Sequence, residues 1–326
     1  MTSFKPCMLA AVLAAVLAAS PLAALAAYPE QPIRLVVPHP AGGSSDILAR
    51  TMAAAMSKDL GQSIVVENKG GGNGAIAAQS VASAKPDGYT LLLATASTHG
   101  INPTLYRKLN YDAVKDFAPV TLFATVPNVL VVGNAHKQMN GLKDLIEYMK
   151  ANPGKTNMGS AGSGTPGHLA GVMLKDAQLL DLVHVPFKGG APAISALIGG
   201  QTDFMFTTIP GAISHIKAGS IKGLAVSSAE RSDALPDLPT VAEAGVPGFE
   251  AVSWHGLVAP ANTPQQVIDT LYQSASKALN SEEVKSKLGN EGAKPAKMTP
   301  AEFGSFIQAQ IGNWGKAVKS SGARVD

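Results

Sequence analysis

The most informative absence in this sequence of 326 residues is cysteine. Its single cysteine, Cys7, lies inside a segment that we expect to be removed on export. The mature chain would then form no disulfide and offer no thiolate as a nucleophile or metal ligand. Excess charge of one sign is also missing, because 26 Lys and Arg face 23 Asp and Glu. Nucleic-acid-binding surfaces are strongly basic, so this balance argues against a nucleic-acid partner.

Signatures of catalysis are missing as well. No serine stands in G-x-S-x-G, the nucleophile elbow of α/β-hydrolases. The seven histidines include no H-x-x-x-H or H-x-H pair, and the acids form no recognisable pair. We therefore predict that the chain is not an enzyme and has neither catalytic nor metal-binding residues.

Glycine-rich patterns that imitate cofactor motifs are present but incomplete. GSGTPG at 162–167 matches G-x-G-x-x-G, and GGGNGA at 70–75 comes close. In a dinucleotide site an acid at the end of the next strand binds the ribose, whereas the next strands here end in VPFKGG and LLLATAS. GKT at 154–156 resembles the end of a P-loop, but Met149 stands where its first glycine belongs. We predict no cofactor.

The N-terminus has the features of a secretory signal peptide. The apolar run MLAAVLAAVLAAS at 8–20 is too short to span a bilayer, and Ala24-Leu25-Ala26 forms an A-x-A cleavage pattern. We predict that residues 1–26 are a signal peptide cleaved near Ala26, and that the mature protein is exported.

Strands and helices alternate along the rest of the chain. This order is typical of α/β proteins, in which parallel sheets are covered by helices. We predict two doubly wound lobes, with two crossings of the chain near 122–130 and 250–258. Lobe one is expected to comprise 27–124 and 252–326, and lobe two 125–251. The expected strands are 33–37, 63–68, 90–97, 128–133, 156–161, 182–187, 202–209, 221–228 and 251–260.

Two further helices are predicted to close the chain. Capping patterns mark their starts at Thr263–Gln266 and Thr299–Glu302. In the second helix, an aromatic and apolar stripe recurs at helical spacing between Phe303 and Trp314. We interpret this stripe as core packing.

Two glycine-rich loops stand between a predicted strand and a predicted helix, one in each lobe. The first is AGGSSD at 41–46 and the second is GSAGSGTPGH at 159–168. The N-terminus of a helix presents free N–H groups and a partial positive charge, which favour anions. Asp46 could instead serve as a first-turn acid that pairs with Arg50.

At these loops the sequence resembles the exported substrate-binding proteins of tripartite tricarboxylate transporters, the Bug proteins. The resemblance covers essentially the whole mature chain. It implies a Venus-flytrap protein of the periplasmic-binding type that holds a small mono-, di- or tricarboxylate between its lobes without catalysis. It also implies a periplasmic monomer that works with two membrane transporter subunits. The matching pieces are YPEQPIRLVVPHPAGGSSDILAR, VVENKGGGNGAIA, KPDGYTLLLATASTHGINPTLY, DFAPVTLFA, GSAGSGTPGHLAG, HVPFKGGAPAISALIGGQTDFMF and WHGLVAPANTP.

The resemblance also assigns ligand-contacting positions, residue by residue. Most lie in the two loops, and Asp203 falls where the family keeps an acid. The positions in lobe one are Pro40, Ala41, Gly42, Gly43, Ser44, Ser45, Asp46, Thr95, Ser97 and His99. Those in lobe two are Ser160, Ala161, Gly162, Ser163, Gly164, Thr165, Pro166, His168, Phe187, Lys188, Gly189 and Asp203.

The first loop departs from the usual family pattern. An aromatic residue is common where His39 stands, and Pro-Thr where Ser44-Ser45 stand. These changes make the expected pocket more polar and leave the identity of the carboxylate open. Neither loop contains an arginine. A carboxylate held there would therefore rely on helix N-termini and hydroxyl groups.

Two other functions remain open at this point. An exported α/β enzyme acting on a carboxylate would need a perturbed acid or base beside the loops. A binding protein used for sensing would differ from a transport protein only in its membrane partner.

Overall fold

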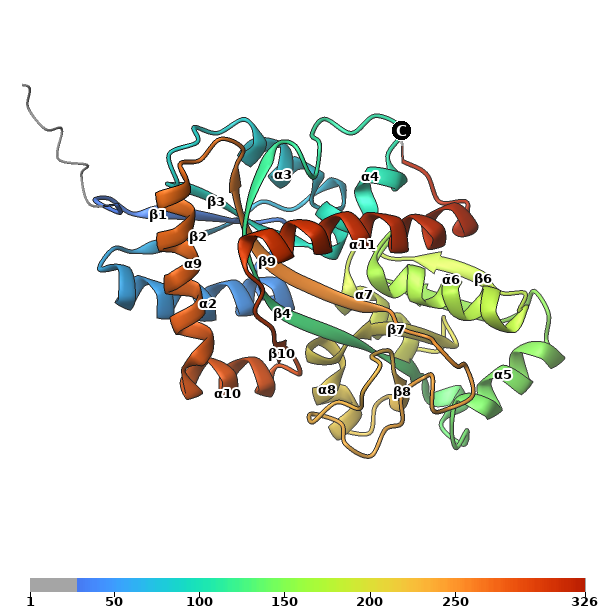
Figure 1. Ribbon diagram of the computed structural model, residues 1–326. Coiled ribbons are helices and arrows are strands. Elements are labelled where there is room, and N and C mark those ends of the chain that lie inside the picture. The colour runs from blue at the N-terminus through green and yellow to red at the C-terminus, as the bar shows by residue number, and fades with distance from the viewer. Residues whose placement is uncertain (1–27, 326) are drawn as a thin grey trace, which may run out of the picture.

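Lobe one begins with three parallel strands. The computed structural model (Figure 1) describes residues 28–325, so the predicted signal peptide lies outside the described residues. β1 (Ile33–Val37) lies between β2 (Ile64–Asn68) and β3 (Thr90–Thr95). α2 (Ser44–Leu60) and α3 (Ala75–Ala82) connect them. The predicted alternation of strand and helix is confirmed here.

β4 (Phe117–Val132) is the strand that joins the two lobes. Its first part pairs antiparallel with β9 (Val252–Pro260), and its second part pairs with β7 (Phe204–Thr208) and β8 (Lys222–Val226). β9 also pairs with β3, so the chain returns to lobe one after building lobe two. β4 and β9 include the positions, near 122–130 and 250–258, where the two crossings are predicted.

The sequence predicted only the second part of β4. The first part contains Pro119, which argues against a strand because proline cannot donate to a ladder. Its pairing with β9 shifts register between Pro119 and Thr121 and again between Leu122 and Ala124. Such irregularities accommodate a proline inside a paired strand.

Lobe two contains a second group of parallel strands. β5 (Asn157–Ser160) pairs with β6 (Val183–Pro186) on one side and with β7 on the other. The helices that accompany these strands are α5 (Leu142–Ala151), α6 (Pro166–Gln178), α7 (Gly190–Ile198) and α8 (Ile209–Lys217).

Three helices, not the predicted two, close the chain. They are α9 (Gln265–Asn280), α10 (Glu282–Asn290) and α11 (Pro300–Ser321), with the short β10 (Lys294–Pro295) before the last. Ser281 ends α9 and caps α10 by accepting a hydrogen bond from the Val284 N–H. The predicted cap at Thr263 is wrong, because its hydroxyl donates to the Pro260 carbonyl. The capping box of Thr299 and Glu302 is confirmed.

α11 covers the strands that join the lobes. Figure 1 shows it lying across the front of the molecule over β9, and it also contacts α6 of lobe two. Phe303 packs against Trp254 with ring centroids 5.8 Å apart, and both side chains are buried. Gly256 has no room for a side chain, since a Cβ there would lie 2.7 Å from the Thr121 carbonyl oxygen. The aromatic stripe of α11 is therefore core, as predicted.

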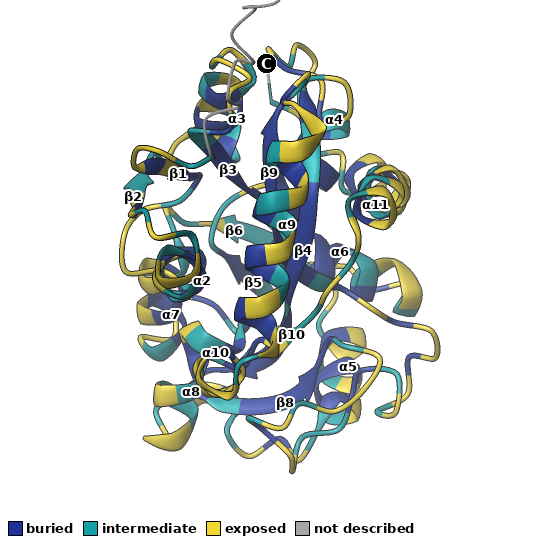
Figure 2. Ribbon diagram, turned by 60° about the vertical axis from the view of Figure 1, so that its left-hand side comes forward, coloured by how far each residue is buried: buried dark blue, intermediate teal, exposed yellow. Residues whose placement is uncertain are grey.

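Most residues of β4 and β9 are buried, and the two strands run through the middle of the molecule in Figure 2. On one face of lobe one, an apolar cluster packs α2 and α9 against the strands. A second cluster runs from lobe one through α11 into lobe two, and a third lies under α7 and α8. Within residues 28–325, no helix has the length and apolar character needed to cross a membrane.

Replacing Phe303 by alanine tests how far stability depends on this junction. The side chain is fully buried against Trp254. We expect Phe303→Ala to lower the free energy of unfolding by about 3–5 kcal/mol, the usual cost of a large aromatic cavity. Gln308→Ala, on the exposed face of the same helix, should change it by less than about 0.5 kcal/mol. Urea denaturation followed by circular dichroism measures both, and equal effects would contradict the role of Phe303.

Candidate functional site

The carboxyl ends of the parallel strands of lobe one meet at one edge of the sheet. β1 ends at Val37, which pairs with Asn68 at the end of β2, and β3 ends at Thr95. In the antiparallel β9, His255 stands opposite Thr95 and so lies at the same edge. Ligands of open α/β sheets bind outside such an edge. Loop one, which we define as residues 38–46, follows β1 and lies there.

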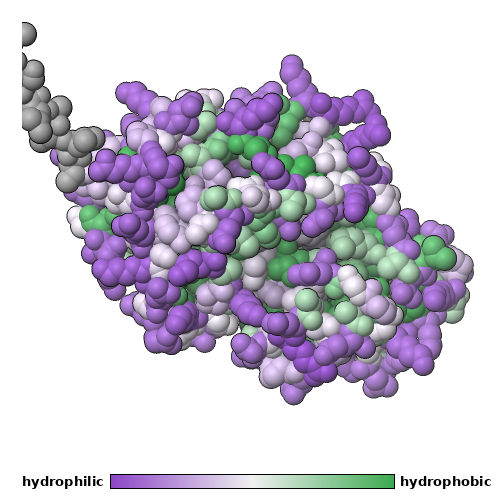
Figure 3. Space-filling model, in the orientation of Figure 1, coloured by the Kyte–Doolittle hydropathy of each residue, from purple (hydrophilic) through white to green (hydrophobic). Residues whose placement is uncertain are grey.

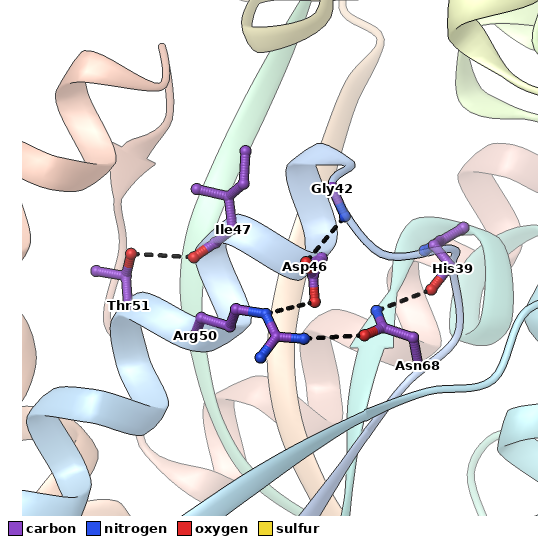
Figure 4. A network of polar contacts seen from close by, with 7 residues as sticks. All are labelled: His39, Gly42, Asp46, Ile47, Arg50, Thr51 and Asn68. Carbon is purple, nitrogen blue, oxygen red and sulfur yellow. Dashed lines mark hydrogen bonds and ion pairs between the residues drawn. The ribbon is translucent and has the colours of Figure 1, made fainter.

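A hydrogen-bonded network holds loop one in shape (Figure 4). The buried Asp46 carboxylate accepts hydrogen bonds from the Gly42 N–H and from Arg50 Nε, both at 2.9 Å. Arg50 also donates to Asn68 Oδ1, and the Asn68 amide donates to the His39 carbonyl. Burial raises the pKa of Asp46, but the hydrogen bonds from Arg50 and Gly42 outweigh it and lower the pKa overall. Asp46 therefore braces the loop as an ionised, paired first-turn acid.

The N-terminus of α2 is left open. Its N-cap, Gly43, carries no side chain to accept a hydrogen bond from the first turn. Pro40, Ala41, Gly42 and Gly43 are exposed. Gly42 has a φ of 80°, which favours glycine. Free N–H groups at the start of a 17-residue helix make a site for an anion.

A polar layer lies directly beneath loop one. Ser45 Oγ is 2.9 Å from His255 Nε2, and both side chains are buried. Burial lowers the pKa of His255 to about 3, with a smaller contribution from the nearby His39. Burial also lowers the pKa of His39 to about 4. Both imidazoles are therefore neutral near pH 7.

Loop two, residues 159–168, is the equivalent connection in lobe two, because it also leads from the end of a strand into a helix. It follows β5 and leads into α6, whose N-cap, Thr165, accepts a hydrogen bond from the His168 N–H. The Gly164 N–H donates to His168 Nδ1 at 3.1 Å, so His168 carries its proton on Nε2. The His168 ring stacks on the His184 ring, with ring centroids 3.8 Å apart. Ser160 Oγ lies 2.6 Å from His184 Nε2. Burial, aided by His184, lowers the pKa of His168 to about 4.

Loop two touches lobe one directly. The Asn73 side chain, in the turn before α3, donates to the Gly164 carbonyl at 3.2 Å and to Asn102. A Cβ on Gly164 would lie 2.3 Å from Leu105 Cδ2 of lobe one. Gly164 is thus needed for the contact between the lobes.

The segment 187–189, which the resemblance assigns to the cleft, packs against loop two. The Phe187 N–H donates to the Ser160 carbonyl at 2.9 Å, and the Gly189 N–H donates to the Ala161 carbonyl at 3.1 Å. Gly189 is also the N-cap of α7, and Lys188 is exposed. Ser163 is exposed on loop two, and Pro166 opens α6.

The strand end at 95–99 is closed off from solvent. The Thr95 hydroxyl forms a capping box with Thr98, which fixes the turn Ala96–Ile101. Ser97 and His99 are buried, and His99 packs edge-on against Phe117 at 4.7 Å. Burial lowers the pKa of His99 to about 3. His99 therefore packs in the core of lobe one, and its assignment to the cleft wall stays a prediction.

Asp203 lies at the wrong end of its sheet for a ligand-binding role. It precedes β7, and its carboxylate accepts from the Asn157 N–H at 2.6 Å and lies 2.7 Å from His136 Nε2. Asn157 begins β5, whereas loop two follows the end of β5 at Ser160. The expectation that Asp203 lines the cleft is corrected for this reason.

Sequence reasoning missed three residues that the structure brings to the two loops. They are His255 under loop one, His184 stacked in loop two, and Asn73 between the lobes. His255 lies in the matched piece WHGLVAPANTP and Asn73 in VVENKGGGNGAIA. Only the register of β9 against β3 shows that His255 is beside loop one.

A cavity of about 680 Å³ lies away from these loops. Val252 and Trp254 of β9 line it together with residues 228–234 and side chains of α11. Successive strand residues face opposite sides, so Trp254 points away from the side that His255 faces. Figure 3 shows the molecule in the orientation of Figure 1, with hydrophobic surface near the middle of the face that is turned toward the viewer. The cavity is therefore on the other face of the β4–β9 pair from loop one.

The buried histidines predict how stability depends on pH. The pKa values of His39, His99, His168 and His255 are lowered mainly by burial, to between about 3 and about 4. Their pKa in the unfolded chain is about 6.5, so below that pH the unfolded state binds protons that the folded state does not. We expect the free energy of unfolding to fall from pH 7 to pH 5, with a slope that approaches about 1.4 kcal/mol per pH unit for each histidine. Urea denaturation across this range measures it, and a stability independent of pH would contradict it.

Comparison with known proteins identifies the family. The family model described as tripartite tricarboxylate transporter family receptor (TctC) matches residues 48–323. BugT of Bordetella pertussis is 34% identical over 299 residues, which cover 91% of each chain.

Solved structures agree with this assignment. R. palustris Rpa4515, solved with adipate, has a TM-score of 0.86 at 36% identity and covers 91% of this chain and 100% of its own. MatC (Rpa3494) of Rhodopseudomonas palustris, solved with bound malate, has a TM-score of 0.80 at 34% identity and covers 89% and 100%. The protein with two lobes joined by β4 and β9 belongs to the TctC family of tripartite tricarboxylate transporter receptors.

Proposed function

We propose that this protein captures a small carboxylate between loop one and loop two and delivers it to a tripartite tricarboxylate-type transporter. The observation that carries the proposal is the pairing of two glycine-rich loops, each leading into a helix N-terminus, one in each lobe. Family membership supports it, as do the carboxylates in two neighbours of similar fold, adipate and malate.

The carboxylate is held by dipoles and hydroxyl groups, with no arginine clamp. Arg50, beside loop one, already pairs with Asp46. The open first turn of α2 and the hydroxyl of Ser163, which is exposed on loop two, supply donors. Hydrogen bonds to a charged group contribute about 1.5–3 kcal/mol each. A few of them, with water excluded, reach the roughly −8 kcal/mol of a micromolar complex.

Closure of the two lobes completes the site. We assign 27–124 and 252–326 to lobe one and 125–251 to lobe two. β4 and β9 cross between the lobes, and the Asn73–Gly164 hydrogen bond joins them on the side of the loops. Bending at the two crossing strands opens and closes the loops around the ligand.

Export and partners follow from the same assignment. We propose a periplasmic monomer whose signal peptide is cleaved near Ala26 and which docks on two membrane subunits. A sensing role would use the same site with another membrane partner. Uptake of the ligand by a strain that lacks this protein distinguishes the transport role from the sensing role. Loss of uptake in that strain indicates a role in transport.

An exported enzyme is the second candidate, because two Ser–His pairs lie in the site. Ser45 with His255 and Ser160 with His184 are at hydrogen-bond distance. Both serines are buried, however, and among the described residues His255 Nδ1 has no acid to orient it. These pairs support the loops, and turnover of a bound carboxylate that is lost in Ser160→Ala would favour the enzyme instead.

Ligand binding is tested by thermal shift and calorimetry on a carboxylate panel. At a concentration 100 times its Kd, a ligand stabilises the folded state by about 2.7 kcal/mol. We expect one or more mono-, di- or tricarboxylates to raise the melting temperature by several degrees. The matching amides, which lack the charge, should not. No shift with any carboxylate or amino acid would contradict the proposal.

Glycine substitutions test the site itself. A Cβ on Gly43 would lie 3.6 Å from its nearest neighbour, the Pro40 oxygen, and the backbone there is extended. Gly43→Val therefore fits the fold but blocks approach to the α2 N-terminus. We expect it to weaken binding at least tenfold with an unchanged melting temperature. Gly141→Val is the matched control, because Gly141 is the extended N-cap of α5, with open space around it. Calorimetry measures both, and normal binding by Gly43→Val would mean that the site lies elsewhere.

A further inference from the structure

Three buried polar atoms around loop one have no hydrogen-bond partner among the described residues. They are His39 Nδ1, Ser44 Oγ and His255 Nδ1. Burying a polar atom without a partner is costly, and folded proteins satisfy nearly all such atoms. Because each atom is closed off from solvent, a partner for it would be enclosed with it, either as part of a ligand or as an internal water.

His255 lies on the side of its sheet that carries an apolar layer. Leu257 of β9 belongs to the cluster that packs under α2. His255 is two residues away on the same strand, so its side chain is on the same face. Ser45, in the first turn of α2, fixes the ring through Nε2 and leaves Nδ1 as the unused nitrogen. His255 thus lies beside the first turn of α2, in contact with Ser45.

His39 approaches from the end of β1. Its backbone carbonyl is held by the Asn68 amide, and its ring is near enough to affect the pKa of His255. Burial keeps both rings neutral at pH 7. Each unused nitrogen is therefore a neutral donor or a neutral acceptor, according to its tautomer.

Neutral imidazole and hydroxyl groups suit an uncharged oxygen better than a carboxylate. A ligand hydroxyl both donates and accepts, as Ser44 and a neutral histidine do. The charge of the carboxylate is already served by the helix N-termini. We propose that His39, Ser44 and His255 form a subsite for a hydroxyl or keto oxygen of the ligand, so that the protein selects hydroxy- or oxo-carboxylates over unsubstituted carboxylates of equal length. This inference rests on the proposed function.

The test compares matched ligands by calorimetry: malate with succinate, 2-hydroxyglutarate with glutarate, and lactate with propionate. In the unaltered protein we expect the hydroxylated member of at least one pair to bind at least tenfold more tightly. His39→Phe, Ser44→Ala and His255→Phe should each reduce that preference to about threefold or less. A site that binds the oxygen loses most of its discrimination when the donor or acceptor is removed.

Controls separate this effect from loss of structure. His215→Phe makes the same substitution on α8 of lobe two and should keep the preference. His255→Phe also breaks the contact with Ser45, so its fold is checked by circular dichroism. Ser44→Ala removes a single oxygen atom and keeps the test decisive if His255→Phe fails to fold.

The outcomes distinguish the two proposals. Equal binding of both members of every pair would overturn the subsite and leave carboxylate binding intact. Equal weakening of both members in the variants would show that the three side chains hold only an internal water, which also overturns it. Failure of every ligand to bind would overturn the proposed function itself.

Discussion

The antiparallel pairing of β4 with β9 is the constraint on which the rest of the structure depends. It brings the chain back to lobe one after lobe two has formed. The same pairing creates the seam that α11 covers with Phe303 against Trp254. The register of β9 also places His255 beside Thr95, under loop one. One strand pair thus connects the lobes, buries their junction and supplies a side chain to the candidate site.

The charged side chains that brace loop one form an ion pair with no net charge. Asp46 and Arg50 neutralise one another, and Asn68 links them to the backbone of loop one. This network leaves the open first turn of α2 as the positive element of loop one. An anion held by helix N-termini gains from dipoles that are fixed by the fold, so little reorganisation is needed on binding. The hydrogen bonds that hold loop one in shape are therefore part of how it can bind.

Neutral histidines recur on both sides of the site. His255 with Ser45 in lobe one corresponds to His184 with Ser160 in lobe two. Burial lowers the pKa of both histidines, so neither adds a positive charge at neutral pH. Hydrogen bonds from these side chains are directional and carry no charge. They therefore contribute more to discrimination between ligands than to electrostatic attraction of any anion. The same burial makes the folded state sensitive to acid.

Sequence patterns by themselves determined the α/β class, most strands, the two glycine-rich loops and the capping box at Thr299, because periodicity, glycine and capping residues act locally. The aromatic stripe from Phe303 to Trp314 was also readable as core, since its spacing is helical. Tertiary structure alone decided the first part of β4, where register shifts accommodate Pro119. It also placed Asp203 beside the start of β5, packed His99 against Phe117 and brought His255 beside loop one, since their positions depend on pairing between strands distant in sequence. Local patterns identify loops that can bind an anion, but only long-range strand register decides which side chains surround them.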